Sequence, residues 1–270
     1  MLELRDIRKT FNPGTVNEVR SLQGVSLTLE EGSFLIVLGT NGSGKSTLLN
    51  AVAGGFALDA GSISIDGHDV TRWAEHQRAR YIGRVFQNPF SGTAPNLSIA
   101  DNLALAARRG QSRGLGRALS GGNLQALHEV VSGLGMGLES RLENMIGSLS
   151  GGQRQALTLL MATMLKPKLL LLDEHTAALD PKSADQVIRI TERVVQRDSL
   201  TTLMVTHSMA QAVSLGDRLI MMHRGQVIED LRGAEKRRLR AEDLLARFEE
   251  VRRADRLDES AAELLRKRYV

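Results

Sequence analysis

The chain has 270 residues, enough for one large domain or for one domain with an appendage. Its hydrophobic content of 42% supports a substantial core, and the absence of cysteine excludes disulfides, thiolate zinc sites and cysteine nucleophiles. The formal net charge of +4 comes from basic residues mixed with acids, and aromatic residues make up only 3%. We interpret this charge as a solvated surface and expect no nucleic acid as a partner.

Neither a signal peptide nor a membrane span is predicted. Residues 1–6 carry acids and lack an apolar segment. No apolar run approaches the ~20 residues that a transmembrane helix requires. Any association with a membrane is therefore expected to be peripheral, through a partner or a surface.

The first part of the chain predicts an antiparallel β region. Residues 2–7 alternate between apolar and polar, as in a half-buried strand, and lead to Phe11; residues 12–14 signal a turn and residues 25–29 alternate again. Phe11, near a strand end, is suited either to the core or to stacking on an adenine ring, and the residues alone leave both open.

The next stretch, GTNGSGKST, fits the pattern G-x-x-x-x-G-K-[ST] between a predicted buried strand (34–38) and a predicted helix (48–53). Its glycines let backbone N–H groups surround phosphate oxygens, and the helix N-terminus adds partial positive charge. Lys45 can reach the β- and γ-phosphates, and the Ser46 hydroxyl can hold Mg²⁺. We therefore predict a nucleoside triphosphate site formed by Gly39, Thr40, Asn41, Gly42, Ser43, Gly44, Lys45, Ser46 and Thr47.

A helical insertion is predicted at about residues 88–165, after a strand at 81–86. It contains helical patterns at 98–106, where Ser98 is the candidate N-cap, and at 124–131, separated by a Gly-, Ser- and Arg-rich segment that is predicted to be flexible (110–122).

The same insertion contains a second candidate anion site, the sequence LSGGQ at 149–153. Ser150 caps the following helix, expected to begin near Gln153, and two glycines expose backbone N–H groups. A similar LSGGN at 119–123 lies inside the flexible segment and much too far before Asp173, so we reject it as a second copy of this site.

The remaining strands and helices alternate, which indicates an α/β layer fold with right-handed crossovers. The apolar strand 169–173 ends in Asp173, which can hold Mg²⁺ through a water, and Glu174, which can polarise the water that attacks the γ-phosphate. The charged segment after residue 235 has helical apolar spacing, and a helix packed back on the body is favoured over a separate module.

Together these motifs resemble the nucleotide-binding subunit of an ABC transporter across residues 1–230, with residues 231–270 as a C-terminal helical extension. The resemblance implies an α/β fold: a P-loop NTPase core with an N-terminal antiparallel β region and an inserted α-helical subdomain. It also implies ATP as the nucleotide and Mg²⁺ as the metal.

The resemblance assigns roles to matching positions. Gln87 matches the glutamine that contacts Mg²⁺ and the attacking water, and His207 matches the histidine that touches the γ-phosphate. Phe11 falls where the family places its adenine-stacking aromatic. The implied catalytic residues are Glu174, His207 and Gln87; the metal ligands are Ser46, Gln87 and Asp173; and the residues acting on nucleotide bound by the opposite subunit are Ser150, Gly151, Gly152, Gln153 and Asp180.

The LSGGQ loop projects from the helical insertion and is not expected to fold back onto the phosphate loop of its own chain. A complete site therefore requires two chains arranged head to tail, each supplying half of both sites. We predict a homodimer that closes on ATP and opens after hydrolysis.

One departure from the family pattern is His175, which stands where proline usually follows the catalytic glutamate. We assign it no catalytic role. The resulting E-H-T variant resembles importer ATPases paired with a periplasmic substrate-binding protein, some linked to aromatic amino acids. The implied partners are transmembrane permease subunits and such a binding protein, and the implied location is the cytoplasmic face of the inner membrane. An exporter ATPase and a non-transport ATPase of a soluble complex remain alternatives.

Overall fold

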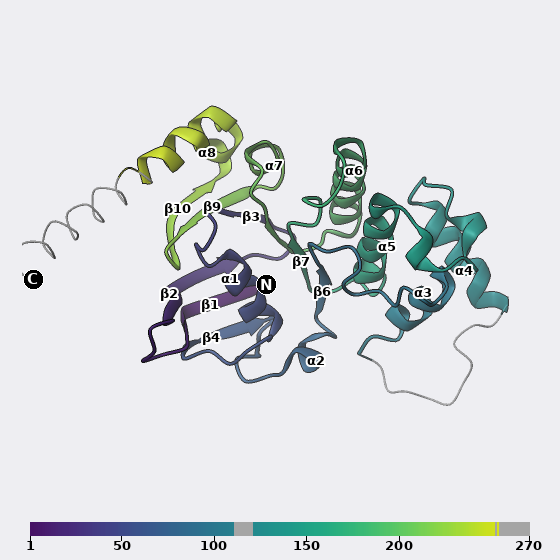
Figure 1. Ribbon diagram of the computed structural model, residues 1–270, viewed down its shortest axis with the longest axis horizontal. Coiled ribbons are helices and arrows are strands. Elements are labelled where there is room, and N and C mark those ends of the chain that lie inside the picture. Colours follow the sequence, from purple (N-terminus) through teal and green to yellow (C-terminus); the bar gives the residue numbers. More distant parts are fainter. Residues whose placement is uncertain (111–120, 252, 254–270) are drawn as a thin grey trace, which may run out of the picture.

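The computed structural model describes residues 1–110, 121–251 and 253, and the side chains of residues 121–124 are not considered. The molecule consists of two sheets and a group of helices (Figure 1). The first sheet is antiparallel and has the strand order β2-β1-β4-β5. Its strands are β1 (Leu2–Phe11), β2 (Val19–Leu29), β4 (Ala60–Ile65) and β5 (His68–Asp69).

The second sheet has the order β10-β9-β3-β8-β7-β6 and is parallel except for the edge hairpin of β9 and β10. Because parallel strands share a carboxyl edge, the loops that follow β3, β6, β7 and β8 open on one side of this sheet. The strands are β3 (Phe34–Gly39), β6 (Ile82–Val85), β7 (Leu169–Asp173), β8 (Thr202–Val205), β9 (Arg218–His223) and β10 (Gln226–Arg232).

Helices cover both faces of the parallel sheet. Helices α3, α4 and α5 gather at the end of the molecule opposite the antiparallel sheet, and α6 lies beside α5 (Figure 1). The α-helices are α1 (Lys45–Ala53), α2 (Glu75–Arg78), α3 (Ile99–Ala107), α4 (Gly121–Ser132), α5 (Gly151–Thr163), α6 (Pro181–Asp198), α7 (Met209–Ser214) and α8 (Gly233–Arg238), with 3-10 turns at Glu139–Arg141 and Ile146–Ser148.

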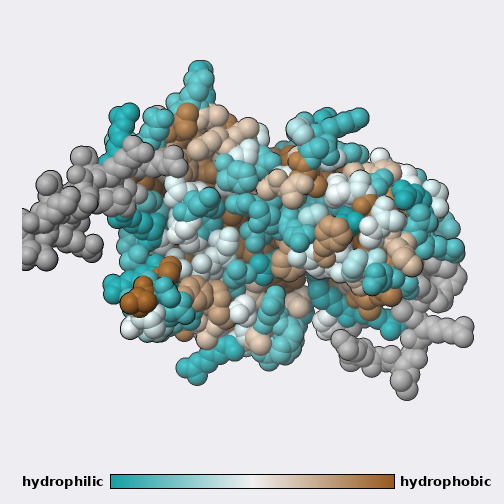
Figure 2. Space-filling model, viewed as in Figure 1, coloured by the Kyte–Doolittle hydropathy of each residue, from teal (hydrophilic) through white to brown (hydrophobic). Residues whose placement is uncertain are grey.

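Alternate residues of β3 point into two separate cores, as the period of two in a strand requires. Leu35 and Val37 pack with α1 and the antiparallel sheet, whereas Ile36 and Leu38 pack with the helices on the other face. Every residue of β3 is buried, which explains why its sequence is continuously apolar rather than alternating. On the face shown in Figure 2, hydrophobic residues form small separate groups among hydrophilic ones.

The predicted α/β fold and its antiparallel N-terminal region are confirmed, with differences at element ends. Strand β2 already begins at Val19, because its first residues pair with the end of β1. Helix α5 begins at Gly151 rather than near Gln153, because Ser150 is the N-cap and the two glycines form the first turn.

The segment after β10 packs on the body as expected. Residues 241–251 are helical, and Leu244 and Phe248 on this helix are buried in the core that includes α7. Arg247 forms an ion pair with Glu229 on β10 at 2.7 Å, and the buried Lys236 of α8 donates to the carbonyl of Val213. The rest of the predicted helical extension, residues 254–270, lies outside the described residues.

Two further expectations fall on residues without a full description. The predicted flexibility of segment 110–122 concerns residues that lie mostly outside the described part of the chain. The LSGGN sequence at 119–123 lies across the same boundary, so its rejection stays a prediction. In the part of the chain that the structure describes, no helix is long and apolar enough to cross a bilayer.

Candidate functional site

The phosphate loop folds as its glycines predict. Gly42 and Gly44 have φ values of 78° and 99°, in the left-handed region that favours glycine. A Cβ on Gly44 would clash with the carbonyl oxygen of Ser21 on β2, so the loop needs glycine for space as well as for conformation. Gly44 also directly precedes the first residue of α1, so the backbone N–H groups of the loop lie at the N-terminus of that helix.

Lys45 lies folded into this loop. Its Nζ donates to the carbonyl oxygens of Gly39 at 2.8 Å and Thr40 at 3.0 Å, which are contacts that phosphate oxygens would replace. Burial lowers the pKa of the Lys45 ammonium, and the nearby carboxylates of Glu174 and Asp173 partly oppose this effect. The loop therefore holds a buried cation in a position to meet an anion.

Three residues that the sequence predicted to be catalytic meet at one carboxylate. Glu174 Oε2 lies 3.2 Å from His207 Nδ1 and 3.3 Å from Gln87 Nε2. Glu174 follows β7, Gln87 follows β6 and His207 follows β8, so their convergence results from the shared carboxyl edge of the sheet. Glu174 has a φ of 42°, a conformation that costs free energy in a residue with a side chain.

Asp173, the last residue of β7, has an unexpected neighbour. Its Oδ2 lies 3.6 Å from Nη2 of Arg84 on β6, and the same Nη2 donates to Asn50 Oδ1 at 2.7 Å. Burial raises the pKa of the Asp173 carboxyl, an effect that Arg84 opposes and Glu174 reinforces. The sequence analysis did not find Arg84, although its place on the strand next to β7 could have indicated the contact.

The residues expected to hold Mg²⁺ fit a hard cation that binds oxygen. Mg²⁺ usually takes one or two protein carboxylates and hydroxyls together with substrate phosphates and water. Asp173 supplies a carboxylate at the edge of the sheet, and the exposed Ser46 supplies a hydroxyl in the first turn of α1. Among the described residues, no cluster of three or more His, Cys, Asp or Glu side chains forms a metal site built by the protein alone, so phosphate oxygens would complete this one.

The LSGGQ stretch is held rigidly by its own chain. Ser150 caps α5 by accepting from the backbone N–H of Gln153, whose side chain in turn accepts from the N–H of Ser150, both at 3.3 Å. A Cβ on Gly152 would come within 2.8 Å of Ser183 on α6. Asp180 is the N-cap of α6, and its side chain accepts from the backbone N–H of Ser183. Hydrogen bonding to Ser183 lowers the pKa of Asp180. The loop thus contacts α6 within the chain and leaves Ser150 exposed.

Arg154 supports this stretch from beneath, a role that the sequence analysis missed. Its buried guanidinium donates to the carbonyl oxygens of Ile146, Gly147 and Leu149, immediately before Ser150. The Phe90 ring lies 3.7 Å from the Arg154 Cζ, so the segment after Gln87 also contacts α5. An arginine near the start of a predicted helix does not by itself predict these contacts.

Phe11 ends β1 in an aromatic pair. Its ring meets Phe56 edge to face at 5.3 Å, and Lys9 Nζ lies 5.5 Å from the Phe11 centroid. The ring is partly exposed, and no contact of the described residues tests its role toward a nucleotide. Adenine stacking therefore stays a prediction for this residue.

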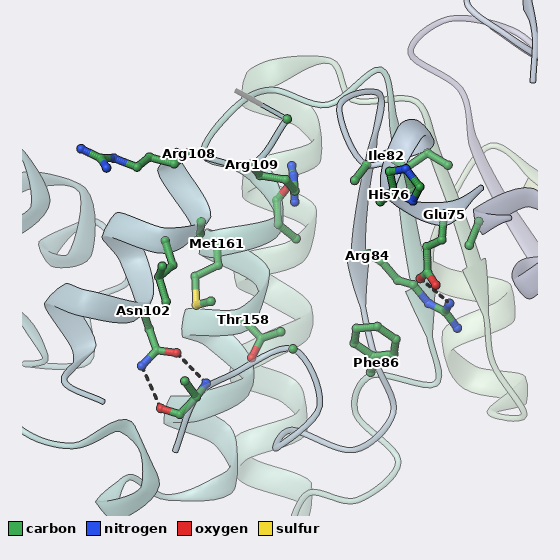
Figure 3. A pocket seen from close by; sticks show the side chains of 18 residues that line it. Glu75, His76, Ile82, Arg84, Phe86, Asn102, Arg108, Arg109, Thr158 and Met161 are labelled. Atoms are coloured by element: carbon green, nitrogen blue, oxygen red, sulfur yellow. Dashed lines mark hydrogen bonds and ion pairs between the residues drawn. The ribbon is translucent and has the colours of Figure 1, made fainter. Parts of the chain in front are cut away.

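A groove of about 860 Å³ lies beside the site rather than at the phosphate loop. Figure 3 shows Asn102, Thr158 and Met161 of α3 and α5 on one side and Ile82, Arg84 and Phe86 on the other. Arg84 therefore lines the groove and also contacts Asp173. A single side chain, that of Arg84, therefore joins the groove wall to the Asp173 carboxylate, which is predicted to hold Mg²⁺.

Comparisons with known proteins show what this chain is similar to. A family model described as ABC transporter matches residues 22–177. A tyrosine transport ATP-binding protein of Clostridioides difficile (strain R20291) is 40% identical over 92% of this chain and 99% of its own length. A spermidine/putrescine import ATP-binding protein of Haemophilus influenzae (strain ATCC 51907) is 32% identical over 85% of this chain and 57% of its own.

Two further similarities bear on direction and assembly. A macrolide export ATP-binding/permease protein of Syntrophobacter fumaroxidans is 36% identical over 87% of this chain, which spans only 32% of that protein. A solved dimeric structure of an ATP-binding cassette in a post-hydrolysis state, bound to ADP and phosphate, is 28% identical with a TM-score of 0.72. It covers 86% of this chain, which covers 98% of it.

Proposed function

The chain belongs to the ABC transporter family of ATP-binding subunits, and from that premise we propose that it powers the import of a small solute, with an amino acid as the first candidate. As a member of this family it is an ATPase, and we propose that it binds ATP through the loop at 39–47. The observation that carries the proposal is the match with the tyrosine transport protein, because that alignment spans 92% of this chain and 99% of the relative.

The proposed chemistry divides hydrolysis among residues that converge in the chain. The glycines of the phosphate loop and Lys45 bind the β- and γ-phosphates and keep them in one orientation. Glu174 accepts the proton of the attacking water. His207 and Gln87 hold the Glu174 carboxylate in place and lie on the side of the site where the γ-phosphate is bound. Mg²⁺, when bound near Ser46 and Asp173, supplies positive charge that stabilises the charge developing on the phosphate oxygens.

A second chain completes each site in this proposal. The exposed Ser150 and the backbone N–H groups of Gly151 and Gly152 form an uncharged anion site at the start of α5. We propose that this site contacts the γ-phosphate bound by the partner subunit, with Asp180 at the dimer interface. The solved dimeric cassette is a relative in which two such chains assemble.

The groove beside Phe86 is the proposed contact with the membrane subunits. It combines apolar side chains such as Leu105 and Met161 with basic ones, including Arg109, at its rim. Two of its guanidinium groups, those of Arg84 and Arg109, have a buried Nε without a hydrogen-bond partner among the described residues. An apolar segment of a permease that ends in a carboxylate or a carbonyl-rich turn fits this groove chemically.

This docking would place the protein at the cytoplasmic face of the inner membrane without a span of its own. A periplasmic substrate-binding protein is the third component that we propose for the importer. An exporter is the second candidate function, because one relative with 36% identity is a macrolide export protein.

Capture from detergent-solubilised membranes tests the proposed assembly. The tagged chain should retain a multi-span protein, and Leu105→Asp should abolish that retention because it places a charge on the apolar groove wall. Val130→Asp is the matched control, since Val130 is also exposed but lies on α4 outside the groove. Equal retention by both variants would contradict docking in the groove.

Uptake of labelled substrate tests the direction and the cargo. Cells that express the chain with its membrane partner should accumulate labelled tyrosine, and Lys45→Ala should abolish the accumulation. Loss of preloaded label in an ATP-dependent manner would instead favour the exporter. Capture of only soluble proteins would contradict transport altogether.

A further inference from the structure

His175, the residue that departs from the family pattern, is buried directly beside Glu174. Its side chain is 1% exposed, and its Nε2 lies 3.0 Å from the hydroxyl oxygen of Thr191 on α6. That hydroxyl donates its proton to the carbonyl of Val187 at 2.9 Å. The imidazole therefore donates from Nε2, and the hydrogen bond joins the turn after β7 to α6.

A histidine at this buried position costs folding free energy. Burial lowers the pKa of His175 to about 4, so the ring is neutral at physiological pH. Among the described residues its Nδ1 has no hydrogen-bond partner, and a buried polar atom without a partner destabilises the fold. An apolar side chain would fill the same volume without that cost, so packing alone does not explain the imidazole.

A second hydrogen-bonded link holds the other side of the same turn. Gln211 of α7 donates through Nε2 to the hydroxyl of Thr176 at 2.9 Å and accepts through Oε1 from the hydroxyl of Thr206 at 2.8 Å. Thr206 also accepts from the backbone N–H of Ser208, which fixes the direction of its own proton. The amide of Gln211 thus joins the turn after β7 to the loop that carries His207.

Glu174 itself needs such support. Its backbone is in the left-handed region with a φ of 42°, and its N–H donates to the Val205 carbonyl at 3.0 Å. A strained conformation persists only where the surrounding contacts determine it. The next two residues, His175 and Thr176, supply one contact each on opposite sides of the turn.

We propose that His175 is a positioning residue for ATP hydrolysis: its hydrogen bond to Thr191, with the Thr176–Gln211–Thr206 bridge, fixes Glu174 between α6 and the loop of His207. The inference rests on the proposed role of Glu174 as the base. It extends that role, because the N-cap of α6 is Asp180, the residue proposed to lie at the dimer interface. A shift of α6 on dimer closure would reach the base through Thr191 and His175.

Conservative and disruptive variants of the same bond test the inference. In His175→Gln the amide nitrogen replaces Nε2 and keeps the bond to Thr191, whereas in His175→Asn the shorter side chain places its nitrogen near the former Nδ1. Thr191→Val keeps the shape and removes the acceptor, and Thr191→Ser keeps the acceptor. We expect His175→Asn and Thr191→Val to lower kcat about tenfold, since misplacing a reacting group has effects of this order or larger. His175→Gln and Thr191→Ser should retain most of the wild-type kcat.

The KM for ATP separates positioning from a general structural defect. It should stay within about twofold of wild type in all four variants, because none of them touches the phosphate loop. As a second measurement, each substitution is combined with Glu174→Gln, and ATP-dependent dimer formation is followed by size-exclusion chromatography. Dimer formation should be unaffected, whereas a fold defect would impair it along with nucleotide binding.

Wild-type kcat in both His175→Asn and Thr191→Val would overturn the inference. A parallel loss of kcat, ATP affinity and ATP-dependent dimer formation would also overturn it, in favour of a purely structural histidine. Failure of the underlying assignment gives a different result, since Glu174→Gln would then turn over ATP at the wild-type rate. If Glu174→Gln is inactive while His175→Asn is fully active, only the positioning role is wrong.

Discussion

The proposed ATP site has two parts, a charged part around the phosphate loop and an uncharged part, the LSGGQ loop at the start of α5. They differ in the groups that the chain supplies to each. Around the phosphate loop, charged or ionisable groups from three segments meet, with Lys45, Asp173, Glu174 and His207 connected by short contacts or by their electrostatic effects. At the start of α5, the LSGGQ loop contains no charged residue and contacts α6 of its own chain. The first part brings together the groups that we propose to act on nucleotide and metal, whereas the second is an uncharged loop with Ser150 exposed at the surface.

In the function that we propose, this difference divides hydrolysis from its control. The charged part supplies groups that act on water and phosphate, and these must be held within hydrogen-bonding distance at all times. The uncharged part offers backbone N–H groups that need only be brought to the γ-phosphate by a second chain. Substitutions in the first part should therefore stop the chemistry directly, and those in the second should act through assembly.

The largest effect is expected for Glu174→Gln in the charged part. Removing the base should lower kcat by roughly a thousandfold, within the range for general-base catalysis. ATP binding should remain, because the carboxylate does not lie in the phosphate loop. Single-turnover hydrolysis and equilibrium binding of a fluorescent ATP analogue measure the two quantities, and wild-type turnover would remove Glu174 from the role of base.

A smaller effect is expected for Ser150→Arg in the uncharged part. The bulky cation should block the approach of the partner nucleotide and lower kcat by about a hundredfold, as when one donor to a transition-state anion is lost. The affinity of the monomer for ATP should not change. Should monomer affinity fall together with kcat, the loop would belong to the nucleotide site of its own chain.

Arg154→Met tests whether the rigidity of the uncharged part matters. The variant removes donors to three carbonyl groups before Ser150 and should lower kcat about tenfold through loss of preorganisation. Arg189→Met, an arginine of α6 outside these contacts, is the matched control. Unchanged ATPase rates in Arg154→Met would show that the loop does not require this support.

Asp230→Asn, a change on strand β10, should have the smallest effect on catalysis but a measurable effect on stability. Burial would raise the pKa of Asp230, but hydrogen bonds from Arg218 and Arg232 outweigh it and lower the pKa below its ordinary value of 3.8. A lowered pKa stabilises the fold above the ordinary value, and this contribution is lost as the pH falls through the folded value.

The variant should therefore be less stable by about 1–2 kcal/mol at pH 7, less than for a fully buried pair because the carboxylate is partly exposed. Urea unfolding across the pH range measures this difference. It should begin to shrink below about pH 4, where Asp230 of the unfolded chain becomes protonated, and vanish once the pH falls below the lowered pKa of the folded carboxylate. A difference that is independent of pH would contradict the ionic origin of the stabilisation.

The two parts were predictable from the sequence to different degrees. Glu174 was predicted from its place after an apolar strand, whereas Gln87 and His207 were predicted from the family resemblance. In the structure all three follow strands of the parallel sheet, whose shared carboxyl edge brings them together. Arg84 and Gln211 were not found, because their importance depends on which side chain lies opposite them across strands or helices. The role of His175 was left unassigned for the same reason: Thr191 is far along the chain and joins it only through the packing of α6.

Cross-linking tests the central claim, that the LSGGQ loop serves the nucleotide of a second chain. The protein contains no cysteine, so Asn41→Cys and Ser150→Cys can each be placed in a separate Glu174→Gln chain and joined by a short bismaleimide. We predict that mixing the two chains gives a cross-linked dimer that depends on ATP and is absent when either chain is alone. If the mixture forms no such dimer with ATP while a single chain carrying both cysteines cross-links internally, the loop acts within its own chain.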